Sequence, residues 1–301
     1  MAQTETNTKT ETEIPFEPKA RTGTPPQTQT DFRLHRRFDR IGRLLGDTAM
    51  SRLGSAHVLV VGLGGVGSHC AESLARSGVG QITLVDFDLV CVTNTNRQVQ
   101  ALRGQVGQPK ATVLAERLRL INPKATIKAV PLPYEARIAD RLLAGPPDLV
   151  IDAIDNVTTK CHLLATCWQR EIPVICSTGA SGRMDPTRVR VADLTQVKVD
   201  RLASSVRKIL RQKHGLPRGK ARWGIQAVYS EERLSEPHEL AYDRDGEFQC
   251  VCPNGDNDVH TCDDRNVVWG TAGFVTAAFG LAAASVAVRT LTGASPAVDQ
   301  N

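Results

Sequence analysis

Aromatic residues are scarce in this sequence, and nothing near its start is typical of a targeting signal. Aromatic side chains make up 4% of the 301 residues, so a core must be built mainly from Val, Leu, Ile and Ala. The hydrophobic content of 41% is enough to bury such a core in one large domain or two. The first 30 residues contain no apolar run, which argues against a secretory signal, and their glutamates argue against a transit peptide. We therefore expect a cytoplasmic protein.

The eight cysteines include no Cys-x-x-Cys pair. Several of them lie inside apolar patterns, as reduced core cysteines do in a cytoplasmic protein. Four residues of types that bind metals cluster within 13 residues, at Cys250, Cys252, His260 and Cys262. Their Cys-x-Cys and His-x-Cys spacings depart from those of structural zinc sites, so we do not expect zinc here.

Composition divides the chain into a tail, a long patterned region and a short end. Residues 1–31 are rich in Thr, Glu, Gln and Pro, which predicts a disordered tail because such a segment buries little apolar surface. Residues 32–290 are expected to form one domain, with an insertion at about 195–265, and residues 291–301 a flexible terminus.

Within the domain, short Val-, Ile- and Leu-rich runs alternate with helical patterns. Strands are predicted at 57–61, 81–86, 125–130, 148–152 and 173–176. Helices are predicted at 66–77, 109–121 and 156–170. This alternation predicts an α/β fold, a Rossmann-like doubly wound and mainly parallel sheet with helices on both faces, followed by a basic C-terminal extension. Ligands of such sheets bind beyond the carboxyl ends of the strands.

A glycine-rich turn separates the first strand from the first helix of this pattern, with glycines at Gly62, Gly64, Gly65 and Gly67. Such a turn lets backbone amides approach a phosphate at a helix N-terminus. Asp86 follows 19 residues after Gly67, at the end of the second strand, where a carboxylate can accept hydrogen bonds from ribose hydroxyls. Asp88 is either a second polar contact or part of the following turn. A nucleotide site is predicted, and these residues alone would also suit a nicotinamide oxidoreductase.

Two cations favour a triphosphate over a nicotinamide cofactor. Arg97 lies in a loop dense with amide side chains, including Asn94, and such loops are typical of ligand sites. Lys110 is predicted in the first turn of a helix, an unfavourable place for a cation unless an anion is nearby. We interpret both as phosphate-binding residues of an ATP site, although a pair of surface cations is the alternative.

Asp155 follows the predicted strand 148–152 and is the candidate metal ligand. A carboxylate at the carboxyl end of this strand can hold Mg²⁺ against nucleotide phosphates. The same position suits the N-cap of the next helix, and the two roles are compatible.

The segment from Lys198 to Trp223 is strongly basic, with nine Lys and Arg residues and a single acid, Asp200. This density suits the phosphate backbone of a nucleic acid, although a solvated surface is the ordinary alternative. The candidate contacts are Arg207, Lys208, Arg211, Lys213, Arg218, Lys220 and Arg222. Trp223 is the single candidate there for stacking on a base.

An uncharged apolar run of 22 residues extends from Val267 to Val288. It is long enough to span a bilayer, but its Gly, Ala and Thr content makes it a weak membrane segment. We expect a helix buried against the sheet or against a dimer partner, without stable transmembrane insertion. Peripheral association with a membrane remains an alternative.

Taken together, these motifs resemble the E1-like adenylating enzymes, the ThiF/MoeB/HesA family related to ubiquitin activation. The motifs that match in order and spacing are residues 62–67, 86–88, 96–98, 107–110 and 155–156. Residues 37–40 also resemble the arginine motif of that family. The resemblance implies that Arg40 reaches into the ATP site of a neighbouring subunit, and hence a homodimer.

Within the family, the chain most resembles the branch that dehydrates threonylcarbamoyladenosine in tRNA. Residues 91–98, 150–155 and 182–187 carry this likeness. It implies ATP-dependent cyclisation of N6-threonylcarbamoyladenosine at tRNA position 37, next to the anticodon, through activation of its carboxylate. Arg97, Lys110, Asp155 and Arg40 would be the catalytic residues, with ATP, Mg²⁺ and a monovalent cation (Na⁺ or K⁺) bound.

The alternative within this family is activation of a ubiquitin-like sulfur-carrier protein. Those activators hold a zinc ion with two Cys-x-x-Cys pairs, which this chain lacks. Some relatives accept sulfur on a cysteine near the C-terminal helix, so a cysteine desulfurase or sulfur-acceptor system is a further candidate partner. Cys250, Cys252 and Cys262 are the residues such a relay would concern.

Overall fold

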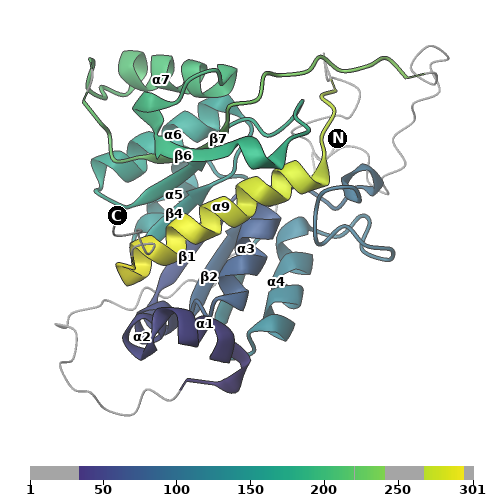
Figure 1. Ribbon diagram of the computed structural model, residues 1–301, viewed down its shortest axis with the longest axis vertical. Coiled ribbons are helices and arrows are strands. Elements are labelled where there is room, and N and C mark those ends of the chain that lie inside the picture. The colour runs from purple at the N-terminus through teal and green to yellow at the C-terminus, as the bar shows by residue number, and fades with distance from the viewer. Residues whose placement is uncertain (1–33, 220, 241–267, 295–301) are drawn as a thin grey trace, which may run out of the picture.

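A computed structural model describes residues 34–219, 221–240 and 268–294. The predicted tail at 1–31, Lys220 and the cysteines at 250, 252 and 262 therefore lie outside the described residues. One seven-stranded sheet runs through the molecule in the order β3-β2-β1-β4-β5-β7-β6 (Figure 1). Its strands are β1 (His57–Val61), β2 (Gln81–Val85), β3 (Thr126–Val130), β4 (Leu149–Asp152), β5 (Val174–Ser177), β6 (Val189–Asp193) and β7 (Gln226–Ser230). All neighbouring pairs are parallel except β6 and β7, which confirms the predicted mainly parallel sheet.

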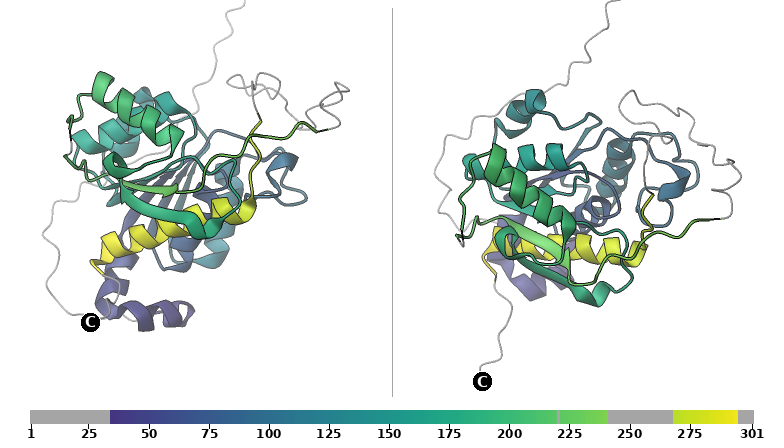
Figure 2. Two further views of the ribbon diagram at one scale, coloured as in Figure 1. Left: turned by 45° about the horizontal axis from the view of Figure 1, so that its top comes forward. Right: turned by 90° about the horizontal axis from the view of Figure 1, so that it is seen from above.

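Helices cover both faces of this sheet, as predicted (Figures 1 and 2). One face carries α1 (Asp39–Leu45), α2 (Asp47–Ser55), α3 (Gly67–Arg76), α4 (Lys110–Ile121) and α9 (Gly273–Thr292). The other carries α5 (Ala136–Leu143), α6 (Val157–Gln169) and α7 (Arg201–Lys213). Within the described ranges, single 3-10 turns labelled η1 to η4 lie at Arg36–Phe38, Val92–Asn94, Pro186–Arg188 and Leu194–Gln196.

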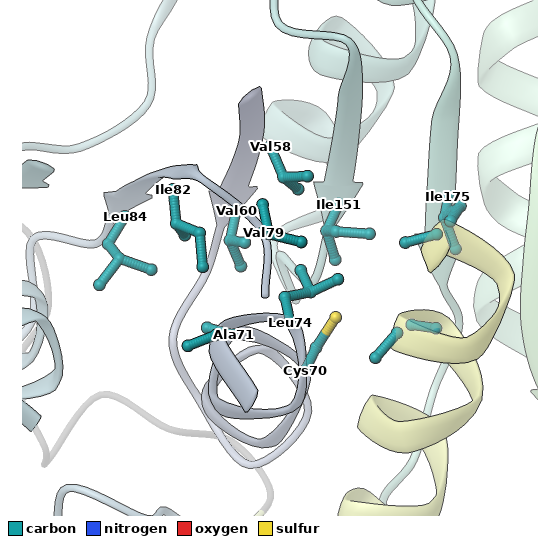
Figure 3. Packing of buried hydrophobic residues seen from close by; sticks show 14 of the residues in the cluster. Val58, Val60, Cys70, Ala71, Leu74, Val79, Ile82, Leu84, Ile151 and Ile175 are labelled. Carbon is teal, nitrogen blue, oxygen red and sulfur yellow. The ribbon is translucent and has the colours of Figure 1, made fainter. Parts of the chain in front are cut away.

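The alternation of side chains along β1 divides the core into two layers. Val58 and Val60 point to one face and pack with Leu74 of α3 (Figure 3). Leu59 and Val61 point to the other face and pack with residues of α6 and α7. From Val58 onward β1 is buried on both faces and its sequence is continuously apolar, which is typical of a central parallel strand. Burying each such side chain contributes roughly 1.5–3 kcal/mol.

The long apolar helix α9 packs across α3 and the sheet (Figures 1 and 2). Glycine allows the close approach, because a Cβ on Gly280 would lie 2.5 Å from the carbonyl oxygen of Val66. Length and composition alone would let α9 cross a membrane, but half of its apolar window is buried inside the protein. The predicted buried helix is confirmed, and it extends two residues beyond the predicted domain boundary at 290.

The basic segment is part of this fold. Helix α7 packs on α6, and β7 pairs with β5 and β6 in the main sheet. A basic extension separate from the sheet is therefore not confirmed. Strand β7 and helix α5 were not predicted from the sequence pattern.

Candidate nucleotide-binding site

The first strand lies between β2 and β4, which places three connecting loops at one edge of the sheet. Val61 is in register with Val85 of β2 and with Asp152 of β4. Gly62, Asp86 and Ala153 therefore follow directly at the carboxyl ends of three adjacent strands. The chain order reverses at this point of the sheet, which is where open α/β folds bind ligands.

The glycine turn fits tightly against its neighbours. Gly62 has φ +88°, and a Cβ there would lie 2.6 Å from the carbonyl oxygen of Ala153. A Cβ on Gly67 would collide with the carbonyl oxygen of Gly62, and one on Gly65 would lie 2.8 Å from Oγ1 of Thr276. By contrast, the nearest atom to a Cβ on Gly64 would be 4.0 Å away. Three of the glycines are required by packing, while Gly64 faces open space beside the N-terminus of α3.

Asp86 holds this turn through both carboxylate oxygens. Oδ2 accepts a hydrogen bond of 2.6 Å from the backbone N–H of Leu63, and Oδ1 accepts one of 2.8 Å from that of Asp88. Burial raises the pKa of Asp86, and the positive charge of Lys110 opposes that shift. Each carboxylate oxygen can accept a further bond. The ribose-binding role of Asp86 stays a prediction that this geometry permits.

Lys110 begins α4, as predicted, and its side chain is only 7% exposed. Nζ lies 2.7 Å from Oδ2 of Asp88, and the backbone N–H of Lys110 donates to the carbonyl oxygen of Asp88 at 2.9 Å. Asp88 is thus both part of the turn and the anion that offsets a cation at a helix N-terminus. The 39% exposed carboxylate leaves one side of this pair open to solvent.

The amide-rich loop after β2 is tied to the turn and to α9. Asn94 caps its own 3-10 turn, since Oδ1 accepts from the N–H of Cys91 at 3.1 Å. The guanidinium of Arg97 donates to the carbonyl oxygen of Thr93 at 2.8 Å. Asn96 accepts a second bond from this group at 2.9 Å and donates to Thr271, ahead of α9, at 2.8 Å.

Gln100, which the sequence pattern did not single out, also supports the glycine turn. It is fully buried, and its Nε2 donates to the carbonyl oxygen of Leu63 at 2.8 Å. The peptide groups of Leu63 are therefore held on one side by Asp86 and on the other by Gln100. A glutamine in a polar loop gives no periodic signal, so sequence alone could not show this contact.

Beneath the loop that carries Asp155 lies an ion pair that sequence reasoning also missed. Nζ of Lys160 lies 2.6 Å from Oδ2 of Asp152 and donates to the carbonyl oxygen of Ser177 at 3.0 Å. Both side chains are almost completely buried. Oδ1 of Asp152 accepts from the N–H of Ile154 at 3.1 Å. The pair thus joins the carboxyl ends of β4 and β5 and fixes the start of the loop.

Asp155 itself is exposed at the end of this loop. The N-cap of α6 is Asn156, whose Oδ1 accepts from the N–H of Thr159 at 3.0 Å, so the capping role falls to the next residue. In the described part of the chain, no group of three or more His, Cys, Asp or Glu side chains could hold a metal. Mg²⁺ at Asp155 would therefore need phosphate oxygens and water as its other ligands, which is its usual environment beside nucleotides.

The geometry fits a nucleotide phosphate at the start of α3. No side chain caps this helix, and its N-terminus favours an anion, although the N–H of Ser68 already donates to the carbonyl oxygen of Gly64 at 3.1 Å. The buried hydroxyl of Ser68, in the first turn, has no hydrogen-bond partner. Open backbone at Gly64, the helix N-terminus and two nearby cations, Arg97 and Lys110, form a set of donors suited to phosphate.

Arg40 lies at the other edge of the sheet. It is an exposed residue of α1. Arg37, just ahead of this helix, donates to the carbonyl oxygen of Ile121 at the C-terminal end of α4. Phe38 packs beside Gly78, just ahead of β2. Within one chain, Arg40 is therefore not brought together with Asp86, Lys110 and Asp155.

The basic residues around α7 divide into structural and exposed cations. Arg207 donates to the carbonyl oxygen of Leu194 at 3.1 Å, and the guanidinium of Arg211 stacks 5.1 Å from the ring centre of Trp223. Lys208, Lys213, Arg218 and Arg222 are exposed. The prediction that Trp223 stacks on a base is wrong, because the ring is only 5% exposed and its Nε1 donates to Pro217 at 3.0 Å.

Fold and site together define a Rossmann-like nucleotide-binding domain of the adenylating type. The model of the ThiF family matches residues 38–301. The chain belongs to the ThiF family.

Known proteins from two branches of the family match different shares of this chain. The chain is 40% identical over 261 residues to the tRNA threonylcarbamoyladenosine dehydratase of Escherichia coli (strain K12), an alignment that covers 84% of this chain and 92% of that protein. Over 137 residues it is 44% identical to the molybdopterin-synthase adenylyltransferase of Salmonella typhimurium, which covers 44% of this chain and 52% of that protein. The likeness to the dehydratase thus extends over nearly twice as much of the chain.

Solved structures agree with the sequence comparison. The E. coli dehydratase in complex with ATP is similar to this structure with a TM-score of 0.73 and 38% identity, covering 85% of this chain and 94% of that chain. The complex of the same protein with AMP has a TM-score of 0.74. The predicted fold and family are confirmed.

Proposed function

We propose that this protein is an ATP-dependent dehydratase that cyclises threonylcarbamoyladenosine in tRNA. The observation that carries this proposal is the 40% identity to a tRNA threonylcarbamoyladenosine dehydratase across 92% of that relative. The site geometry agrees, because a glycine turn, a helix N-terminus and two cations meet at the carboxyl edge of the sheet. A sulfur-carrier activator remains the less favoured alternative, since that likeness covers 44% of the chain.

In this reaction the threonyl carboxylate is activated by ATP, and a nitrogen or oxygen of the same side chain then attacks the activated carbonyl. The ring closes as the nucleotide leaves with one carboxylate oxygen, so the nucleoside loses one water in total. The protein must hold the carboxylate against the α-phosphate and neutralise charge that develops there. Arg97 and Lys110 would provide that charge, and Asp155 would hold Mg²⁺, which would supply further charge neutralisation. No enzyme nucleophile is required.

A homodimer would complete the site. Arg40 is exposed at the edge of the sheet opposite to the glycine turn, so it can serve the nucleotide only in another subunit. The exposed cations Lys208, Lys213, Arg218 and Arg222 would contact the tRNA backbone. A bound Na⁺ or K⁺, a sulfur-transfer partner and a cytoplasmic location with peripheral membrane contact through α9 belong to the same proposal.

Mass analysis of tRNA nucleosides tests the proposed reaction. Purified protein is incubated with ATP, Mg²⁺ and tRNA that contains threonylcarbamoyladenosine, and the nucleosides are released under mild conditions because the ring reopens in base. We expect a nucleoside lighter by one water that forms only when ATP is present. If ATP is bound and the nucleoside stays unchanged, the acceptor is a different carboxylate, and a carrier protein becomes the first candidate.

A further inference from the structure

The structure leaves one aromatic side chain free to stack on a base. Among the Phe, Tyr and Trp residues of the described ranges, Phe274 alone is exposed, with 54% of its surface accessible. It lies in the first turn of α9, where a large apolar side chain gains nothing from exposure. Trp223, the candidate that the sequence offered, is buried.

Phe274 lines a shallow surface hollow of roughly 560 Å³. Apolar atoms of Phe274, Ala277 and Val99 form part of its lining, and the remainder includes Asn96, Arg97 and Gln98. The hollow thus combines an exposed aromatic ring, amide groups that can donate or accept hydrogen bonds, and one guanidinium. This combination suits a nucleotide, with a flat base and an anionic phosphate.

His69 of α3 contributes a second flat ring to the hollow. Burial lowers the pKa of this histidine, while a hydrogen bond with the backbone of Arg97 opposes the shift. This shift favours the neutral form of the ring. Arg97 is the one Lys, Arg, Asp or Glu among the lining residues, and the rest of the hollow can accept an uncharged base.

The hollow borders the nucleotide site. Gln98, one of its lining residues, has its Nε2 4.0 Å from the position that a Cβ on Gly64 would occupy. On the other side, Thr276 of α9 packs against Gly65. A base held in the hollow would therefore lie beside the glycine turn, close to the phosphates of a bound ATP.

We propose that this hollow binds an unstacked base of the single-stranded tRNA loop that carries the reacting nucleoside, with the ring of Phe274 stacked on that base. Proteins that recognise single-stranded RNA splay bases out and stack them on aromatic side chains and arginine planes. The inference rests on the proposed function, and it assigns the part of the site that holds the RNA loop. Helix α7 then supplies charge, and Phe274 supplies the contact with the base.

Three variants test this role. Phe274→Ala removes the ring, Phe274→Tyr keeps a ring that can stack, and Leu281→Ala is the matched control. Leu281 lies two turns along the same helix, is 52% exposed and is not among the residues that line the hollow. We expect Phe274→Ala to weaken tRNA binding and raise the KM for tRNA roughly tenfold, in keeping with the loss of one stacked base. The other two variants should behave like the wild type, and the Kd for ATP, measured by calorimetry, should not change in any of them.

Other outcomes would overturn the assignment. Unchanged tRNA affinity in Phe274→Ala would remove the hollow from the RNA footprint. Weaker ATP binding in Phe274→Ala would make the hollow part of the nucleotide site. Equal effects of Phe274→Ala and Leu281→Ala, with a lower molecular mass by light scattering, would show that this face of α9 packs against protein. Binding is measured separately from turnover. A wild-type protein that binds tRNA without dehydrating it would therefore overturn the proposed function, while the binding data would still show whether the hollow contacts RNA.

Discussion

Two charged regions of this molecule hold their side chains in different ways. At the carboxyl edge of the sheet, Asp86 is bonded to two backbone N–H groups, Lys110 is paired with Asp88, and Lys160 is buried against Asp152. Around α7, most of the described cations are exposed to solvent, whereas Arg207 and Arg211 have structural contacts. The first arrangement fixes groups in place before a ligand arrives, as catalysis requires. The second supplies a diffuse positive surface, which suits a polymer backbone.

The largest effect should come from charges that face the nucleotide. Lys110→Ala and Asp155→Ala should each lower turnover by roughly 10²–10³-fold or more, because each removes stabilisation of phosphate charge. Rates of nucleoside dehydration at saturating tRNA give this result, and circular dichroism checks the fold. Lys124→Ala, which changes an exposed lysine beyond the end of α4, is the matched control. A near-normal rate in either site variant would show that the site is wrongly assigned.

The buried ion pair should affect stability first and activity second. Lys160→Met leaves Asp152 buried without its partner, which costs about 3–5 kcal/mol in the free energy of unfolding. Asp152→Asn combined with Lys160→Met removes both charges and should recover most of that loss, as measured by urea denaturation.

The same double variant separates a structural role of the pair from a positioning role. Turnover should stay low in it even though stability returns, because the pair no longer fixes the loop that carries Asp155. Full recovery of both stability and turnover would mean that the pair serves stability alone.

The exposed cations of α7 should have a smaller effect that depends on salt. Lys208→Ala combined with Lys213→Ala should weaken tRNA binding at low salt and reduce the slope of log K against log salt by about 2, since each phosphate contact contributes about 0.9. Arg207→Ala should instead lower stability, because its guanidinium is bonded to Leu194. An unchanged slope in the double lysine variant would remove α7 from the tRNA surface.

Local patterns were sufficient to predict the framework of the site. The buried strand at 57–61, the glycines after it and the start of a helix at Lys110 all carry short-range signals, and the structure confirms them. Strand β7 was missed because its five residues include polar side chains and because it joins the sheet far from its neighbours in sequence.

Contacts between distant segments could not be predicted in this way. Lys160 meets Asp152 only because α6 packs back onto β4, and Gln100 reaches Leu63 across 37 residues. The burial of Trp223 depends on its packing beside α7, so its side chain could be read as a base-stacking group from the sequence. A periodic pattern shows which face of an element is buried, but it does not show which polar groups meet there.

Oxygen transfer from the substrate tests the central claim most directly. The threonyl carboxylate of the tRNA-bound nucleoside is labelled with oxygen-18, the protein is supplied with unlabelled ATP, and the nucleotide and phosphate products are analysed by mass spectrometry. Activation of the carboxylate by ATP predicts one labelled oxygen in AMP, or in inorganic phosphate if the product is ADP, and one retained in the cyclic nucleoside. Cyclic product formed without any label in nucleotide or phosphate would contradict carboxylate activation at this site.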